Sequence, residues 1–124
     1  MKNILRDLNR SVGIKGSMIV TRDGVVVAAE LGEGLEEDRV AAIASVLIPS
    51  IRRSLERAEV GPFFKCVLTA TEGKLVVVDA GIAFLVVATD RSIRLDITML
   101  DIDAAAQRIE QKGRIEIAPE ATVS

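Results

Sequence analysis

A run without a single charged residue, from Val40 to Ile51, most constrains how this chain can fold. Acidic residues precede the run and arginines follow it, which is the charge pattern of a helix whose ends complement its dipole. A helix on the surface of a small monomer carries a polar stripe toward water. This helix lacks such a stripe, so it needs cover on more than one side. In a chain of 124 residues, we expect another molecule to supply the second cover.

Size and composition predict one cytoplasmic domain. The length suits a single domain, and the apolar fraction of 49% is enough for a core. The charge-free run is shorter than the roughly 20 residues that span a bilayer, and the N-terminus lacks the apolar core of a signal peptide, so no membrane insertion is expected. One cysteine, Cys66, permits no internal disulfide and favours a reducing compartment. The net charge of −2, with both signs interspersed, excludes a typical nucleic-acid-binding face.

Hydrophobic periodicity and turn signals predict the order α-β-β-α-β-β-β-α. Helices are expected over residues 2–12, 36–59 and 93–111, and strands over 17–22, 25–31, 63–71, 74–80 and 82–89. Gly13 and Gly16 are expected to end the first helix, and Gly113 the last. The domain is then residues 1–113, followed by a loosely ordered tail over 114–124 in which Arg114–Ile117 could add a short strand.

The strands predict a three-layer α/β (α+β) fold. Short turns such as Asp23-Gly24 make consecutive strands antiparallel. The runs Leu75–Val78 and Phe84–Ala88 are apolar on both faces, so they need cover on both faces. We therefore expect a five-stranded antiparallel sheet with the middle helix on one face and the N- and C-terminal helices on the other.

Placed at about 100° per residue, the middle helix divides into two surfaces. An aliphatic stripe is expected to pack on the domain's own sheet: Val40, Ile43, Ala44, Leu47, Ile48, Ile51, Leu55 and Ala58. The opposite side carries the small or weakly polar residues Ala42, Ser45, Val46 and Pro49. One interpretation is a homodimer in which this side meets its twofold mate. The alternative is a helix face that tolerates solvent.

The helix face alone would bury only a few hundred Å², below the roughly 1,000 Å² of a stable interface. A second element is therefore needed. The strand Phe63–Thr71 directly follows the helix, and as an edge strand it could pair with its own copy. Lys65, Val67 and Thr69 on this strand complete the predicted dimer interface.

The sequence offers little for catalysis. It contains no histidine, the usual general base near neutral pH, and a lone cysteine without histidine excludes the common zinc sites. Gly73-Lys74 lacks the remaining residues of a phosphate-binding loop. We therefore predict no enzyme activity, no cofactor, no metal and no small-molecule substrate.

Arginines flank the charge-free run and are the candidate contacts for a partner protein. They are Arg39, Arg52, Arg53 and Arg57. Arginine recognises acidic or phosphate-bearing partners, and an arginine supplied to a nucleotide can accelerate GTP hydrolysis. The alternative for the last three is compensation of the helix dipole.

The chain resembles the Roadblock/dynein light chain family over nearly its whole length. The resemblance depends on the order and spacing of several segments rather than on one motif. These are the opening helix with Leu8, the segment Val12–Val20, the turn Arg22–Gly24, the Ala-rich middle helix, Gly73–Val77, Phe84–Thr89 and the closing helix. Pro49 within the middle helix departs from the family pattern.

The resemblance implies a homodimer formed by the middle helices and the third strands, with one sheet continuous across both copies. It implies no catalytic residue, and a role as a scaffold or regulator of a small Ras-like GTPase. Two alternatives stay open, namely a structural light chain of a larger complex and a small-ligand sensor of the PAS or GAF type. A sensor pocket is usually lined by aromatic or polar groups, and this chain has three Phe and no Trp, Tyr or His.

Overall fold

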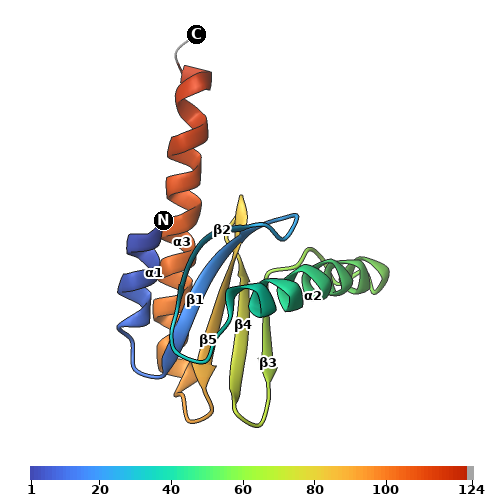
Figure 1. The fold of residues 1–124 in the computed structure, drawn as a ribbon. Coiled ribbons are helices and arrows are strands. Elements are labelled where there is room, and N and C mark those ends of the chain that lie inside the picture. The colour runs from blue at the N-terminus through green and yellow to red at the C-terminus, as the bar shows by residue number, and fades with distance from the viewer. Residues whose placement is uncertain (123–124) are drawn as a thin grey trace.

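The computed structural model describes residues 1–122, with side chains described for residues 1–114. The predicted order of helices and strands is confirmed (Figure 1). The elements are α1 (Lys2–Asn9), β1 (Ile14–Thr21), β2 (Val26–Leu31), α2 (Glu37–Arg57), β3 (Lys65–Thr69), β4 (Gly73–Asp79), β5 (Ala83–Asp90) and α3 (Leu95–Thr122). No helix in the described part of the chain combines the length and apolar character needed to cross a bilayer.

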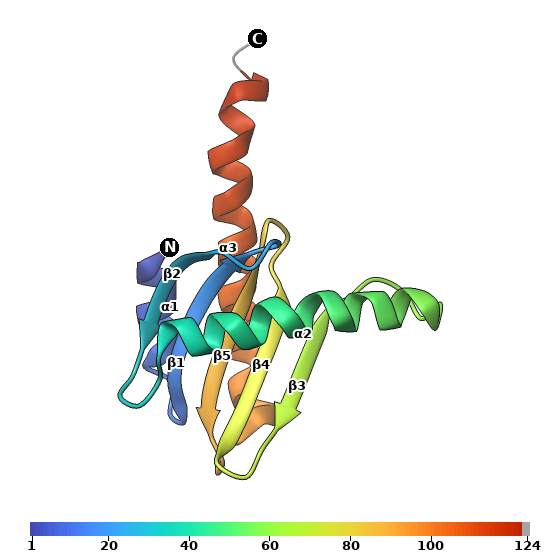
Figure 2. The same ribbon diagram turned by 45° about the vertical axis from the view of Figure 1, so that its right-hand side comes forward.

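The strands form one sheet in the order β2-β1-β5-β4-β3, and every neighbouring pair is antiparallel. Helix α2 crosses one face of the sheet, and α1 and α3 lie together on the other face (Figures 1 and 2). The predicted three-layer arrangement is therefore confirmed. The sheet places β2 and β3 at its two edges.

The sheet divides the core into two clusters. The cluster on the α2 side includes Met18, Val20, Phe63, Val77, Phe84 and Val86, and the α1/α3 side includes Leu5, Leu8, Ile19, Val76, Leu85 and Ile102. Consecutive residues of β4 and β5 alternate between the clusters, as side chains on a strand must. This alternation explains why Leu75–Val78 of β4 and Phe84–Ala88 of β5 are apolar without interruption, since both faces of the sheet are covered by helices.

The first helix is shorter than predicted. It ends at Asn9, and Arg10 is its C-cap, so Val12 lies in the loop before β1 with 92% of its surface exposed. The chain must turn here to enter the sheet, and Gly13 adopts a φ of 90° that favours glycine. Gly16 lies within β1 and does not end a helix. The position favours glycine because a side chain there would collide with Leu31 of β2.

The last helix is longer than predicted, because α3 runs through Gly113 to Thr122. The possible strand at Arg114–Ile117 is therefore wrong. Gly113 is buried against Ile82, and a Cβ at Gly113 would collide with the Ile82 side chain. The glycine thus allows the helix to approach the β4–β5 turn closely, and it does not end the helix. The division of the chain at residue 113 stays a prediction.

Candidate functional site

Helix α2 buries one stripe against the sheet and exposes the opposite one. Val40, Ala44 and Ile48 are buried in the α2-side core. On the outer side, Val46 is 74% exposed and Ala42 is also exposed. A shallow apolar depression runs along this side, lined by Ala42, Ile43, Val46 and Leu47. A continuous apolar surface of this kind is typical of a contact with another protein.

Three residues assigned to the sheet-facing stripe lie elsewhere. Leu47 is half-buried and lines the outer depression instead of the α2-side core. Ile43 is 51% exposed and belongs to the outer depression, because it lies about 100° around the helix from the centre of the buried stripe. Ala58 is exposed at the C-cap of α2. Figure 2 shows why, since the C-terminal part of α2 projects past β3 and has no sheet of its own chain beneath it.

Ser45 and Pro49 lie on the flanks of the outer side of α2. Ser45 is exposed, and its hydroxyl donates to the Ala42 carbonyl oxygen at 2.9 Å. The turn between β1 and β2 approaches this point, and a Cβ on Gly24 would lie 2.8 Å from the Ser45 Cβ. Pro49 is half-buried, and α2 continues through it. Both residues stay predicted interface residues.

Strand β3 has an open and regular backbone edge. The Asp79 amide donates to the Phe64 carbonyl oxygen at 2.9 Å and the Ala70 amide to the Gly73 carbonyl oxygen at 2.8 Å. In an antiparallel ladder alternate residues bond to one neighbour, so Lys65, Val67 and Thr69 direct their backbone groups away from β4. These are the residues of this strand that the sequence assigned to the dimer interface.

The opposite edge of the sheet is irregular. The β1–β2 register shifts at Ile19/Val20, where Ala28 and Val26 take successive partners and Val27 is left unpaired. A bulge of this kind twists an edge strand and disrupts its ladder, which makes it a poor template for another strand. Strand β3 pairs with β4 without any shift. The better edge for pairing with another chain is therefore β3.

The side chains of β3 extend the apolar surface on both faces. Val67 lies opposite Val76 and so on the α1/α3 face, whereas the partly exposed Leu68 lies on the α2 face. Lys65 is held to α3 by an ion pair of 2.8 Å between its Nζ and the Asp103 Oδ1. Cys66 packs on the α2-side cluster, and burial raises the pKa of its thiol, so the neutral form is favoured.

The four arginines do not form one group within the chain. Arg39, at the start of α2, pairs with Glu36 at 3.1 Å, with both side chains exposed. Arg53 and Arg57 are exposed near the other end of α2, about 20 Å away at the 1.5 Å rise of a helix. Arg52 is half-buried. The two exposed arginines adjoin the projecting end of α2 and stay candidates for a partner contact.

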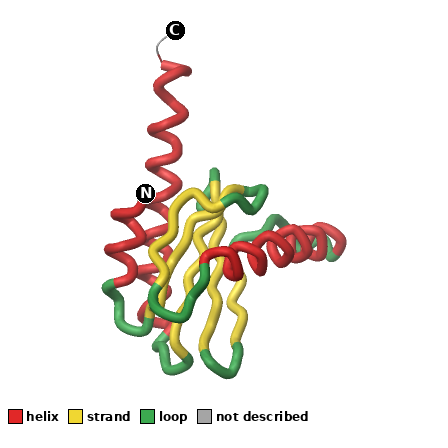
Figure 3. The backbone as a smooth tube through the Cα atoms, viewed as in Figure 1, coloured by secondary structure: helices red, strands yellow, loops and turns green. Residues whose placement is uncertain are grey.

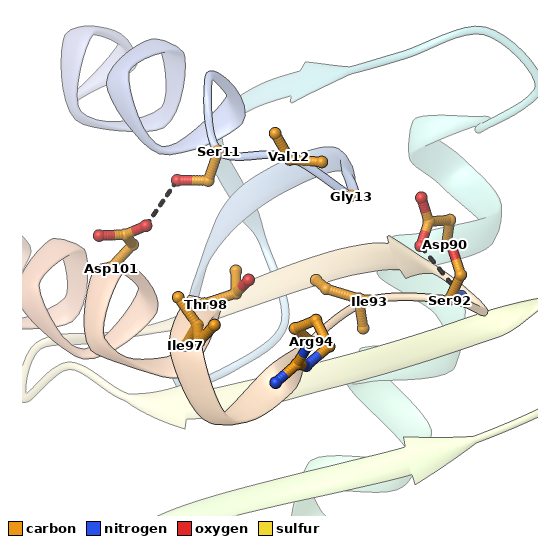
Figure 4. Close-up of a pocket in the computed structure, with 10 residues that line it drawn as sticks. All are labelled: Ser11, Val12, Gly13, Asp90, Ser92, Ile93, Arg94, Ile97, Thr98 and Asp101. Carbon is orange, nitrogen blue, oxygen red and sulfur yellow. Dashed lines mark hydrogen bonds between the residues drawn. The ribbon is translucent and has the colours of Figure 1, made fainter.

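The α1–β1 and β5–α3 loops lie close together at one end of the sheet (Figure 3). A separate cavity of about 350 Å³ lies between these two loops (Figure 4). Val12 and Gly13 form one wall, and Ile93, Ile97 and Thr98 form the facing wall. This site was not predicted from the sequence, because the predicted helix over residues 2–12 includes Val12. Ser11 and Gly13, which flank Val12, favour a loop and could have indicated an exposed valine.

Metal ligands do not gather in the described part of the chain, where no three Asp, Glu, Cys or His side chains are close enough to hold an ion. Exposed apolar side chains are found on the outer side of α2, along the β3 edge and at the loop cavity. All three are suited to contacts with other proteins.

Comparison with known proteins places the chain in a family. Residues 1–89 match the model of the Roadblock/LC7 domain. Two Methanocaldococcus jannaschii proteins described as uncharacterized are 34% identical over 107 residues, which cover 86% of this chain and 94% of each relative. A Roadblock/LC7 domain from Streptomyces avermitilis has a TM-score of 0.80 at 19% identity and covers 90% of this chain and 96% of its own. Myxococcus xanthus MglB has a TM-score of 0.82 at 16% identity and covers 90% and 93%. The chain therefore belongs to the Roadblock/LC7 family.

Proposed function

We propose that the protein is a homodimer formed through the outer side of α2 and the edge of β3. The observation that carries this proposal is the continuity of the two surfaces, because α2 projects past the β3 edge (Figure 2). Pairing two β3 strands would place the projecting half of each α2 over the partner's sheet. The half-buried Ile51 and Leu55 pack on the α2-side core of their own chain, and the partner would add to that cover. Edge and helix together supply the area that the helix face alone lacks.

The geometry of β3 restricts the register of the pairing. Residues that form hydrogen-bonded pairs across a twofold axis must both direct their backbone groups outward. With Lys65, Val67 and Thr69 outward, the register that uses the whole strand places Val67 opposite its own copy and Lys65 opposite Thr69. The neighbouring symmetric registers would instead place Cys66 or Leu68 on the axis.

A cysteine at position 67 is therefore expected to cross-link the dimer. Hydrogen-bonded antiparallel pairs have Cα atoms about 5.5 Å apart, which is within disulfide range. The Cys66→Ser/Val67→Cys variant should form a reducible dimer on a non-reducing gel under mild oxidation. Cross-linking of the wild-type protein through Cys66 would indicate the register with Cys66 on the axis. Cross-linking of Cys66→Ser/Leu68→Cys would indicate the register with Leu68 on the axis.

The matched control is Cys66→Ser/Val27→Cys, which places a cysteine on the bulged β2 edge. This variant should stay monomeric on the same gel. Cross-linking through position 27 alone, or through none of the three β3 positions, would contradict pairing through β3.

We further infer that this dimer is a non-enzymatic scaffold or regulator of a small Ras-like GTPase. Membership of the Roadblock/LC7 family and the likeness to the MglB fold support this inference. The exposed Arg53 and Arg57 offer two guanidinium groups beside the proposed dimer surface, suited to an acidic or phosphate-bearing partner. No catalytic step is assigned to the chain itself.

The test uses a small Ras-like GTPase from the same organism, chosen by gene neighbourhood. Calorimetry should show binding to the GTPase loaded with GDP or with a non-hydrolysable GTP analogue, with affinities that differ about tenfold or more between the two states. Hydrolysis and nucleotide-exchange rates then separate an activator, an exchange factor and a passive scaffold.

The charge-reversal variant Arg53→Glu/Arg57→Glu should weaken this binding. Arg10→Glu, which changes an exposed arginine at the C-cap of α1, is the control and should leave the binding unchanged. If the protein is a dimer but binds the GTPase in neither nucleotide state, the regulatory role is refuted and the proposed dimer is not affected.

A further inference from the structure

The turn that ends α2 holds a glutamate in a backbone conformation that favours glycine. Glu59 has a φ of 57°, in the left-handed region, and the other five residues with positive φ in the described part of the chain are all glycines. A side chain in this region costs stability, because its Cβ crowds the following carbonyl oxygen. The short side chains of asparagine and aspartate offset part of that cost by local hydrogen bonds, whereas glutamate has a longer side chain.

The hydrogen bonds at this turn are those of a Schellman motif. The Glu59 amide donates to the Glu56 carbonyl oxygen at 3.2 Å, and the Val60 amide donates to the Leu55 carbonyl oxygen at 3.3 Å. In such a motif glycine usually takes the position of Glu59, and an apolar residue at the position of Val60 usually packs back on the helix. Val60 is instead 69% exposed. Two neighbouring residues therefore depart from what the turn itself favours.

The two side chains are open to a contact from outside the chain. The Glu59 side chain is exposed, and its carboxylate has no hydrogen bond or ion pair with any residue that the structure describes. A Cβ on the neighbouring Gly61 would meet no atom within 4 Å, and this end of α2 projects past β3 (Figure 2). Residues held in unfavourable backbone conformations are typical of binding sites, where a contact made by the side chain offsets the cost.

We propose that Glu59 and Val60 are specificity-determining contacts for the GTPase, which would present a basic side chain beside an apolar one. The inference rests on the proposed regulatory role and extends it, because Arg53 and Arg57 select only an acidic or phosphate-bearing group. A carboxylate next to these arginines requires a partner surface that carries both signs of charge, in matching positions.

A second copy of the chain suits Glu59 less well than a different protein does. The twofold axis that pairs β3 with itself reverses the direction of α2, so the end of one α2 lies toward the start of the other. The start of α2 carries Glu36, Glu37 and Asp38, and its one arginine, Arg39, is already paired with Glu36. These carboxylates would repel Glu59, so the GTPase is the better source of the cation.

Glu59→Gly and Glu59→Gln separate the backbone conformation from the charge. Glycine removes the strain, so the midpoint of thermal unfolding should rise by about 2–4 °C at one fixed protein concentration. Glutamine keeps the strain and should change the midpoint by less than about 1 °C. In calorimetry with the nucleotide-loaded GTPase, both variants should bind about tenfold more weakly than the wild type.

Matched variants control for the charge and for the apolar contact. Asp96→Asn removes an exposed carboxylate at the start of α3, on the other face of the sheet, and should leave GTPase binding unchanged. Val60→Ser should weaken the binding about fivefold, because buried apolar surface is lost. Val25→Ser, at an exposed valine in the β1–β2 turn, should not change it.

The outcomes separate this contact from the regulatory role itself. Wild-type protein that binds the GTPase in neither nucleotide state would overturn both. Wild-type binding that neither Glu59 variant weakens would overturn the contact alone, whether or not Glu59→Gly is more stable. Sedimentation equilibrium should give Glu59→Gln the dimer affinity of the wild type, and a weaker dimer would assign Glu59 to the contact between copies and exclude the proposed role.

Discussion

Val46→Glu is expected to convert the dimer into a monomer at micromolar concentration. Val46 is the most exposed large apolar residue on the outer side of α2. In the proposed symmetric dimer the substitution would introduce one carboxylate from each copy into the apolar contact. An unpaired charge buried in an interface costs about 3–5 kcal/mol. This cost corresponds to about a hundredfold or greater rise in the dissociation constant. Sedimentation equilibrium over a range of concentrations measures the change.

The matched control for Val46→Glu is Val25→Glu, which adds the same charge at an exposed valine in the β1–β2 turn. This variant should remain a dimer with unchanged affinity. Neither substitution should change the stability of the folded monomer itself, since neither valine is in the core. A Val46→Glu protein with the dimer affinity of the wild type would exclude the outer side of α2 from the interface.

Phe84→Ala is expected to lower the free energy of unfolding by about 3–5 kcal/mol, the usual cost of removing a fully buried aromatic side chain. Phe84 is fully buried in β5, the central strand of the sheet. Its ring meets Phe63 edge to face with centroids 5.9 Å apart, and the Arg22 guanidinium carbon lies 4.8 Å from its centroid. The substitution therefore removes contacts with two neighbours and leaves a cavity beneath α2.

The control for Phe84→Ala is Phe64→Ala, because the Phe64 ring is 66% exposed. Its loss should cost less than about 1 kcal/mol. Urea denaturation at one fixed protein concentration compares the variants, since association would otherwise contribute to the apparent stability. Equal losses for both substitutions would mean that the ring of Phe84 does not hold the α2-side core together.

The sequence predicted the elements well where hydrophobic periodicity was strong, and it failed at particular glycines. Gly13 and Gly113 look alike in the sequence, yet Gly13 turns the chain with a positive φ and Gly113 lets α3 lie close to Ile82. The second role depends on a residue from a different element, which no local pattern reveals. The first error also hid the loop cavity, because the predicted helix over residues 2–12 included Val12.

The candidate interface was also predictable only in part from the sequence, because parts of it depend on how separate elements pack together. The charge-free run identified an exposed side of α2, and the strand after it was a reasonable candidate edge. The periodicity misassigned Ile43, because a stripe drawn broadly around the helix includes residues at its margins. The sequence could not show which edge strand is bulged, since that irregularity depends on how β1 and β2 align.

The unpaired Val27 has a consequence for how far association can proceed. If both edges of the sheet accepted a neighbour, each added copy would offer a fresh template and the protein could grow into a fibre. With one receptive edge and one distorted edge, the addition of a second copy uses up the receptive edges of both. In the proposed dimer, growth would therefore end at two copies, so the bulge at Val27 would oppose the formation of fibres.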